Sequence, residues 1–191
     1  MKIHILFGMI GFILLSGCNR AAEKNPRFYD AGVSRELAGH RKAQIKNLKY
    51  ELSFNIPRQK EVAIEGDITL RFDLASRQEV LIDFREEREK IKEVIANGVP
   101  VDKVRFENEH IILPASSTVE GANEIRIRFT AGNQSLNRND EYLYTLLVPD
   151  RARTVFPCFE QPNLKAEFTL QLELPADWKA VSNTYIRSCL L

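Results

Sequence analysis

The sequence predicts an all-β fold, a saddle-shaped antiparallel β-sandwich, and three observations carry that prediction. Apolar and polar residues alternate over two long segments, 48–56 and 62–74, which the turn-forming PRQK separates. Shorter segments with strand character recur along most of the remaining chain. Helical periodicity is almost absent, so strands must build the core.

Each element follows from a local pattern. Ser34 is a typical helix N-cap and Gly39 a typical stop, so a short helix is expected between them. Asn97-Gly98 predicts a tight hairpin, because both residues accept positive φ. Gly66, inside a strand pattern, indicates a bulge or a bend. The predicted strands are 48–56, 62–74, 80–84, 91–96, 99–106, 110–113, 124–129, 142–148, 167–174 and 178–181.

Composition indicates one globular domain and disfavours one class of partner. The chain has 191 residues, of which 44% are hydrophobic and 28% charged, which is ordinary for a globular protein. The 27 Lys and Arg residues nearly balance the 26 Asp and Glu residues, without a long run of one sign. Nucleic-acid binding leaves a basic footprint, so we expect no nucleic-acid partner.

The N-terminus has the plan of a secretory signal over residues 1–18. A lysine near the start precedes an apolar run from Ile5 to Leu15, which is shorter than the roughly 20 residues that a membrane span needs. The following Ser16-Gly17-Cys18 resembles a bacterial lipobox, whose cysteine becomes the acylated first residue. This implies lipidation at Cys18 and an exported lipoprotein anchored at the periplasmic face or the cell surface. An uncleaved anchor helix or a chance cysteine is the alternative.

The rest of the chain divides into three parts. Residues 19–44 are polar and of mixed charge, and we expect a tether that leads into the short helix. Residues 45–183 hold the strand patterns and form the β-saddle domain. Residues 184–191 form a tail without a clear pattern.

Few cysteines and histidines are available for chemistry. Cys158 and Cys189 can pair in an oxidising compartment, although their spacing does not decide this. A nucleophilic Cys158 needs a histidine partner, and no local signature supplies one, so a buried small apolar side chain is favoured. His110 beside Glu109 is a possible metal ligand, but a hydrogen-bonded or solvated histidine is favoured there. No metal site is predicted.

The segment from residue 131 to 168 is irregular and rich in aromatic, aliphatic and proline residues. Long ordered loops in a compact domain are usually functional, so we expect a surface on which something docks. Residues 152–168, ARTVFPCFEQPNLKAEF, resemble the corresponding segment in the N-terminal domain of the aminopeptidase N family of zinc metallopeptidases, peptidase family M1. Matching residues are Ala152, Arg153, Phe156, Pro157, Cys158, Phe159, Pro162, Lys165, Ala166 and Phe168. Glu160 stands where that family usually has Asp.

The resemblance implies a role beside a substrate cleft rather than in the chemistry. In that family the N-terminal β-saddle packs on a thermolysin-like catalytic domain and closes one side of the cleft. The segment near that junction resembles a wall and brace of the cleft. We call its residues the cleft-wall motif: Arg153, Phe156, Pro157, Cys158, Phe159, Glu160 and Pro162. The implied partners are the catalytic domain, peptide substrates and, through the lipid, a membrane.

The family's chemistry needs an HExxH helix for zinc and a GxMEN strand for the substrate amine. Neither occurs here, because none of the three histidines precedes a glutamate and the only methionines are Met1 and Met9. We therefore expect no catalytic residue and no cofactor in this chain, with zinc in the catalytic domain, and no activity of the chain alone. Many family members bind the substrate amine with a Gln or Glu just before P-x-x-A-R, where Val148 stands here. Glu141, seven residues earlier and expected on the same strand, is the substitute to test, and an exposed carboxylate at the strand end is the alternative.

The family pattern ends after DWKAVSN, and TYIRSCLL does not resemble it. A truncated, frameshifted or misassigned gene is the favoured explanation, and the sheet then lacks edge strands. An alternative function stays open, in which the chain is a stand-alone surface lipoprotein that binds a peptide, a glycan or a partner protein.

Overall fold

The computed structural model describes residues 26–102 and 104–185. The predicted signal with Cys18, the first part of the tether and most of the predicted tail with Cys189 lie outside the described residues. Among the described helices, none is both long and apolar enough to cross a membrane.

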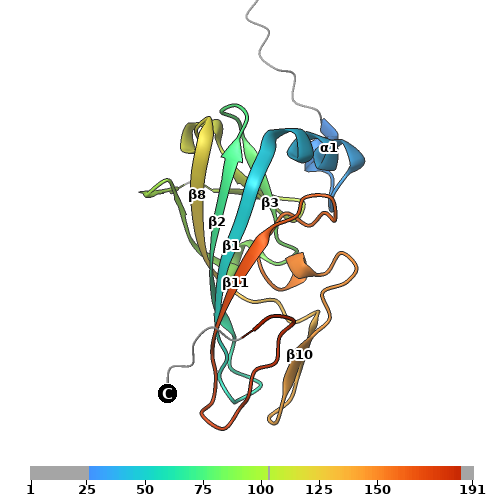
Figure 1. Ribbon diagram of the computed structural model, residues 1–191, viewed down its shortest axis with the longest axis vertical. Coiled ribbons are helices and arrows are strands. Elements are labelled where there is room, and N and C mark those ends of the chain that lie inside the picture. Colours follow the sequence, from blue (N-terminus) through green and yellow to red (C-terminus); the bar gives the residue numbers. More distant parts are fainter. Residues whose placement is uncertain (1–25, 103, 186–191) are drawn as a thin grey trace, which may run out of the picture.

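A six-stranded sheet forms the main layer, in the order β11-β1-β2-β8-β4-β5 (Figure 1). Its strands are β1 (Ile45–Asn55), β2 (Glu65–Leu74), β4 (Ile91–Ala96), β5 (Val99–Pro100), β8 (Gly121–Thr130) and β11 (Glu167–Glu173). A second sheet has three strands in the order β3-β7-β6, namely β3 (Val80–Asp83), β6 (Arg105–Glu107) and β7 (His110–Leu113). A separate two-stranded ribbon pairs β9 (Leu136–Arg138) with β10 (Leu143–Thr145).

The five described helical elements are short, and two of them lie before β1. They are η1 (Pro26–Tyr29), α1 (Arg35–Gln44), η2 (Arg88–Lys90), η3 (Ala115–Ser117) and η4 (Ala152–Thr154). The Ser34 side chain accepts a hydrogen bond from the Leu37 backbone N–H, 3.1 Å, which confirms the predicted N-cap. Gly39 does not end the helix, contrary to the prediction. α1 continues to Gln44 and passes directly into β1, because Arg41 and Leu37 are held in buried positions.

The small sheet lies between two apolar clusters, because its strands β3 and β7 are buried on both faces. Val80 and Ile82 of β3 join the main core with Ile68 and Ile125 of the large sheet. Leu81 points the other way and packs with Leu37 of α1. The layers are therefore large sheet, small sheet and N-terminal helices, and burial of apolar area on both faces of β3 stabilises the whole stack.

The longest strands and the tight hairpin confirm the sequence analysis. β1 and β2 pair antiparallel, and their inward residues are buried in alternation. Asn97 and Gly98 have φ of 52° and 79°, as the hairpin requires.

Other expectations were wrong in detail. β11 pairs with β1 in parallel, so the large sheet is mixed. No strand forms at 178–181, because the chain turns at Trp178, whose N–H donates to the Pro175 carbonyl, and Val181 is 96% exposed. The predicted strand 99–106 divides into β5 and β6, and 142–148 shortens to β10.

Gly66 does not mark a bulge. It pairs in regular register with Phe54 on one side and Phe129 on the other. A Cβ at this position would lie 2.4 Å from Cζ of Phe129, so the ring needs the space that glycine leaves. The bulge in this strand pair lies instead in β1, between Lys46 and Lys49, where Asn47 has φ of 52°.

Candidate functional site

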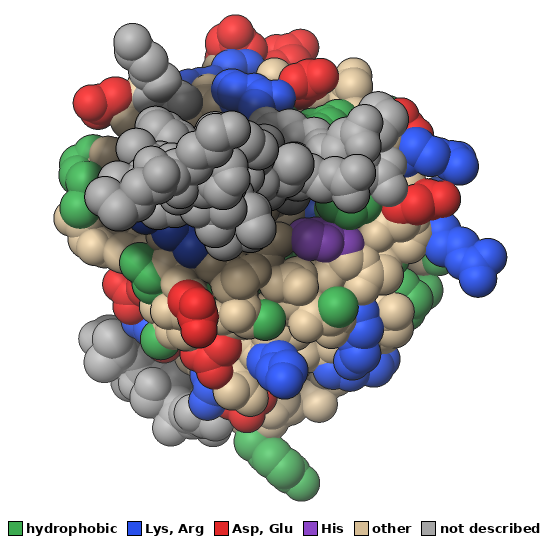
Figure 2. All heavy atoms as spheres, turned by 90° about the horizontal axis from the view of Figure 1, so that it is seen from above, with side chains coloured by type: hydrophobic (Ala, Val, Ile, Leu, Met, Phe, Trp, Pro, Cys, Tyr) green, Lys and Arg blue, Asp and Glu red, His purple; other side chains and the backbone are tan. Residues whose placement is uncertain are grey.

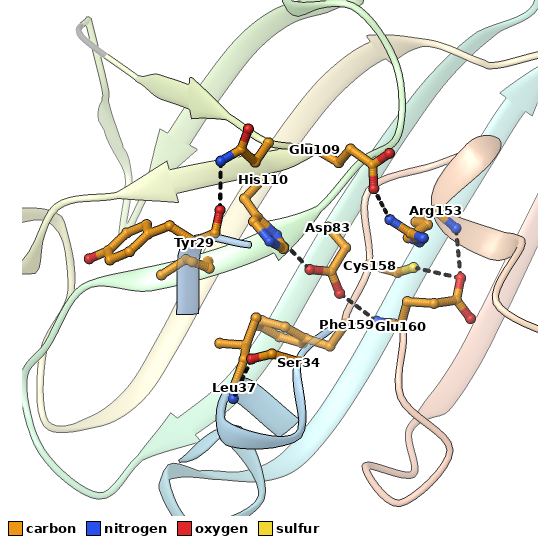
Figure 3. Close-up of polar contacts among 12 residues, drawn as sticks. Tyr29, Ser34, Leu37, Asp83, Glu109, His110, Arg153, Cys158, Phe159 and Glu160 are labelled. Atoms are coloured by element: carbon orange, nitrogen blue, oxygen red, sulfur yellow. Dashed lines mark hydrogen bonds and ion pairs between the residues drawn. The ribbon is translucent and has the colours of Figure 1, made fainter. Parts of the chain in front are cut away.

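The cleft-wall motif lies between β10 and β11 and is tied to the small sheet. η4 begins the segment, and Cys158 then pairs with the last residue of β3 in an isolated antiparallel bridge. The Cys158 N–H donates to the Asp83 carbonyl, 3.0 Å, and the Asp83 N–H donates to the Cys158 carbonyl, 2.8 Å. The irregular segment thus has a fixed position against the core (Figure 3).

The Asp83 carboxylate is fully buried and accepts hydrogen bonds from three parts of the chain. Nη1 and Nη2 of Arg41 bind its two oxygens at 2.8 and 2.6 Å. Nδ1 of His110 lies 2.9 Å from Oδ1, and the Glu160 backbone N–H donates to Oδ2, 2.8 Å. Burial raises the pKa of Asp83, but the Arg41 charge and the His110 hydrogen bond outweigh burial and hold the pKa below its ordinary value.

His110 connects this carboxylate to the N-terminal segment. Its Nε2 lies 3.0 Å from the Asp30 carbonyl oxygen, and its side chain is fully buried. The prediction of a hydrogen-bonded histidine is confirmed. Both ring nitrogens are engaged, so His110 has no nitrogen free for a metal, and no group of three metal-ligating side chains occurs among the described residues.

Arg153 forms a second ion cluster at the start of the motif. Its side chain is buried and binds both carboxylate oxygens of Asp150, at 3.0 and 2.9 Å, and a carboxylate oxygen of Glu109. Its backbone N–H donates to Oε2 of Glu160, 2.8 Å. Burial and the nearby charges of Asp150 and Asp83 raise the pKa of Glu160 in spite of that hydrogen bond.

Cys158 is a buried, unreactive thiol. It is 4% exposed, it is a free cysteine, and its Sγ lies 3.9 Å from Oε2 of Glu160. Burial, together with the negative charges of Glu160 and Asp83, raises the pKa of the thiol well above its ordinary value. A catalytic thiolate needs the opposite environment, so the reading of Cys158 as a buried small side chain is confirmed.

The aromatic residues of the motif point inward. Phe159 packs edge-on against Phe72 at 5.7 Å between centroids, and its backbone N–H donates to the Tyr50 hydroxyl, 2.9 Å. Phe156 meets the ring of Phe54 at 6.3 Å. Pro157 is also buried, whereas Pro162 is exposed and Glu160 is half-buried. Inside this chain, therefore, the cleft-wall motif acts as a brace, which means that its buried residues fix the irregular segment to the core.

The ribbon next to the brace presents an apolar surface to solvent. Every second residue from 142 to 148 is a large exposed apolar side chain, and we call the set the apolar stripe: Tyr142 at 53%, Tyr144 at 49%, Leu146 at 51% and Val148 at 84% exposure. The alternate residues Leu143 and Leu147 pack on the main core. The segment therefore contacts the core through the partly buried Leu143 and Leu147, whereas Thr145 between them is exposed, and the stripe faces solvent.

Glu141 lies in the turn before β10 and not on the strand, contrary to the expectation. It is exposed, and its backbone N–H donates to Oδ1 of Asn139, 2.9 Å. The motif and the stripe are neighbours along the chain, but Glu141 precedes the stripe and is not buried among the motif residues.

Three residues that hold the cleft-wall motif in place were missed from the sequence: Asp83, Arg41 and Tyr50. A signal for Asp83 was present, since it is a carboxylate inside the apolar run Val80–Phe84 that follows the strand pattern, and buried charges are normally paired.

The end of the molecule seen in Figure 2 carries Lys, Arg, Asp and Glu side chains interspersed rather than in a patch of one sign.

Comparisons with known proteins place this geometry in a family context. The sequence profile of the Peptidase M1 N-terminal domain matches residues 46–189. Aminopeptidase N of Streptomyces lividans is 32% identical over 166 residues, which is 80% of this chain and 19% of that protein. Leucine aminopeptidase 2 of Candida glabrata is 25% identical over 72% of this chain and 23% of its own length. The chain thus spans about a fifth of the length of these relatives.

Solved structures agree on the fold. Native yeast LTA4 hydrolase superposes with a TM-score of 0.58 at 20% identity, over 70% of this chain and 24% of that chain. An M1 zinc metallopeptidase from Deinococcus radiodurans gives a TM-score of 0.55 at 18% identity, over 68% of this chain and 32% of that one.

Proposed function

Because the chain belongs to the peptidase M1 N-terminal domain family, we propose that it is the noncatalytic β-saddle domain of an exported, lipid-anchored zinc aminopeptidase. Its task is to complete a catalytic domain that removes N-terminal residues from peptides. The domain supplies one wall of the peptide cleft, and the catalytic domain supplies the zinc and the reacting groups.

The apolar stripe is the observation that carries this proposal. Four large apolar side chains exposed at every second position are more than a monomeric surface usually leaves in one place. Leu143 and Leu147, which alternate with them, pack against the core, and the cleft-wall motif that follows is fixed by paired charges. A rigid apolar face of this kind suits docking against a second domain.

The zinc belongs to the partner domain in this proposal. A zinc ion in such enzymes polarises the scissile carbonyl and activates water. The described residues do not fit that ion, since His110 is engaged at both ring nitrogens and Nε2 of His40 lies 2.6 Å from Oε1 of Gln78. The sequence has no HExxH to supply the ligand set.

Anchoring rests on the lipobox-like sequence before Cys18. An acylated Cys18 keeps the domain at a membrane surface on the far side of the inner membrane. Residues 19–25 then separate the lipid from η1, the first described element.

A second candidate function has one observation in its favour. A pocket of about 560 Å³ lies between α1 and the start of β3, with Phe28, Leu37, Leu81 and Phe159 among its walls. This volume is within the range of small-ligand sites, roughly 300–1,000 Å³. A stand-alone binding module would use it for an apolar side chain of a peptide. Calorimetric titration with apolar tetrapeptides tests this function. Saturable binding heat that Phe28→Ser abolishes supports the binding module, and the absence of binding heat rules it out.

The noncatalytic role is tested with the purified chain and aminoacyl chromogenic amides, with the zinc content measured on the same sample. We expect neither turnover nor stoichiometric zinc. Chelator-sensitive turnover with one zinc per chain would overturn the proposal. The replacements His40→Ala and His110→Ala would then show whether the chain's own histidines bind the metal.

A further inference from the structure

Both ring nitrogens of His110 face oxygen atoms that carry no hydrogen. Nδ1 lies 2.9 Å from Oδ1 of Asp83 (Figure 3), and Nε2 lies 3.0 Å from the backbone carbonyl oxygen of Asp30. The carbonyl can only accept a hydrogen bond. The Asp83 side chain is an ionised carboxylate, because the Arg41 charge and the His110 hydrogen bond outweigh burial and hold its pKa below the ordinary value. Each ring nitrogen must therefore supply the hydrogen of its own contact.

The imidazolium form alone satisfies this arrangement. A neutral imidazole has one N–H donor and one acceptor nitrogen, whereas the imidazolium has two donors. A neutral ring would direct a lone pair at one of the two oxygens. His110 is 0% exposed, so solvent does not relieve such a contact, and a buried polar group that lacks its hydrogen bond is destabilising. The arrangement thus favours the charged form of His110.

Asp83 can balance this charge although it also binds Arg41. The two Nη atoms of Arg41, on α1, contact the two Asp83 oxygens at 2.8 and 2.6 Å. The Glu160 backbone N–H, in the cleft-wall motif, donates to Oδ2, 2.8 Å. A carboxylate has about four acceptor positions, and these three contacts together with His110 fill them.

The remaining titratable side chains around His110 are paired elsewhere or neutral. The pairs are Asp30 with Arg27, Glu109 with Arg85 and Arg153, Glu160 with the Arg153 backbone N–H, and Tyr29 with Glu79. Burial raises the pKa of the Cys158 thiol well above the ordinary value, so this thiol stays neutral. Asp83 is therefore the carboxylate that holds the charged ring in place.

Loss of one proton from His110 should break the contact with Asp30. A carboxylate attracts an N–H more strongly than a neutral carbonyl does, so Nδ1 keeps its hydrogen and Nε2 becomes an acceptor. Two acceptors then face each other at the Asp30 carbonyl. The segment from residue 26 to 33 keeps a second link, because the Asn108 side chain donates to the Tyr29 carbonyl, 2.7 Å. Deprotonation thus loosens the segment and does not release it.

We propose that His110 is a pH-sensitive latch on residues 26–33, the segment that leads into α1. The charged ring ties this segment to Asp83, and the neutral ring loosens it. The cleft-wall motif stays in place in both forms, because Arg41 and the Glu160 N–H still bind Asp83. Histidines ordinarily change charge between about pH 5 and 8, and several pH sensors use this change. The latch is independent of the proposed function, since it requires no catalytic partner and no anchor.

Nuclear magnetic resonance of the full chain, labelled with ¹³C and ¹⁵N, tests the latch from about pH 5 to 9. Both ring nitrogens of His110 should carry hydrogen at the acid end, and Nδ1 alone above the midpoint of the titration. The carbonyl carbon signal of Asp30 should shift with the same midpoint, because it loses its donor. Amides of residues 27–33, corrected for the intrinsic effect of pH, should exchange at least about tenfold faster above the midpoint, and those of β2 should not.

Two variants separate His110 from other titrating groups. His110→Gln does not titrate, so pH should no longer change the corrected exchange of residues 27–33. His40→Gln is the matched control, because the His40 ring lies 4.8 Å from that of Phe28 between centroids, and it should leave the pH effect intact. If His110→Gln does not fold, the His110 and Asp30 midpoints in His40→Gln decide. Equal midpoints support the latch, and separate midpoints overturn it.

Three other results would overturn the latch. The first is a His110 ring that carries a single hydrogen, or both hydrogens, at every pH. The second is a titration of His110 that leaves the Asp30 carbonyl signal and the exchange of residues 27–33 unchanged. The third is a pH effect on these residues that persists in His110→Gln or disappears in His40→Gln.

Discussion

Cys158 and Asp83 are joined by two backbone hydrogen bonds, although 75 residues separate them in sequence. The bridge holds the cleft-wall motif against β3, and the Asp83 side chain then gathers Arg41, His110 and the Glu160 N–H around the same point. The loop is therefore ordered by buried charges as well as by apolar contact.

Loss of the Asp83 carboxylate should strongly destabilise the fold. Asp83→Ala leaves the guanidinium of Arg41 buried without its counter-charge, and breaking a buried pair in this way costs about 3–5 kcal/mol. Chemical denaturation measures the free energy of unfolding. Asp67→Ala is the control, because its partner Arg126 is 53% exposed, and it should cost less than about 1 kcal/mol. Equal losses in the two variants would show that Asp83 does not organise the brace.

Stability should fall in acid because of the same carboxylate. The pKa of Asp83 is lower in the folded protein than the unfolded value of about 4. Its contribution is therefore complete above pH 4 and is lost as the pH falls through the folded pKa. Glu160 affects stability in the opposite direction. Its pKa is raised in the folded protein, so its ionisation destabilises the fold. Unfolding at a series of pH values should show a weaker acid dependence in Asp83→Asn than in the wild type. An unchanged profile would exclude this role of Asp83.

Gly66 and Gly39 should respond to alanine in opposite directions. At Gly66 the new Cβ meets the Phe129 ring, and overpacking of a core costs about 1–3 kcal/mol. At Gly39, inside α1, a Cβ has nothing within 4 Å, and alanine stabilises a helix by up to about 1 kcal/mol relative to glycine. Thermal unfolding of the two variants measures whether each substitution lowers or raises the stability. A tolerated Gly66→Ala would mean that Phe129 moves freely.

The sequence predicted those elements whose signal is local. Alternation over 48–56 and 62–74 located β1 and β2. Asn97-Gly98 predicted the tight hairpin, because both residues accept the positive φ that the turn needs. Strand partners and directions depend on residues far apart in the chain, so the parallel pairing of β1 with β11 was not visible. Gly39 illustrates the same limit, since tertiary burial of Leu37 and Arg41 outweighs a local stop signal.

The candidate site was predicted in part for a similar reason. The motif was recognisable as a segment, but whether its phenylalanines line a cleft or fill a core depends on the surfaces that meet them. The structure places Phe156 and Phe159 in the core, and the exposed apolar surface is the neighbouring stripe. The cleft-wall role of the segment stays a prediction.

Cys158 should be inert until the protein unfolds. In a Cys18→Ser, Cys189→Ser background at pH 8, a thiol reagent should label folded protein at least about a hundred times more slowly than protein in denaturant, because burial suppresses the thiolate. Labelling at equal rates would contradict the buried position of Cys158.

A chimaera of Streptomyces lividans aminopeptidase N that carries residues 46–183 of this chain in place of its matching segment tests the docking role. We expect a zinc-loaded, active aminopeptidase in which Leu146→Asp, in the apolar stripe, lowers kcat/KM at least about tenfold. Val119→Asp, at an exposed apolar residue outside the stripe, should change it little. A folded, zinc-loaded chimaera without activity, or one that Leu146→Asp leaves fully active, would contradict the role of this domain in completing a catalytic partner.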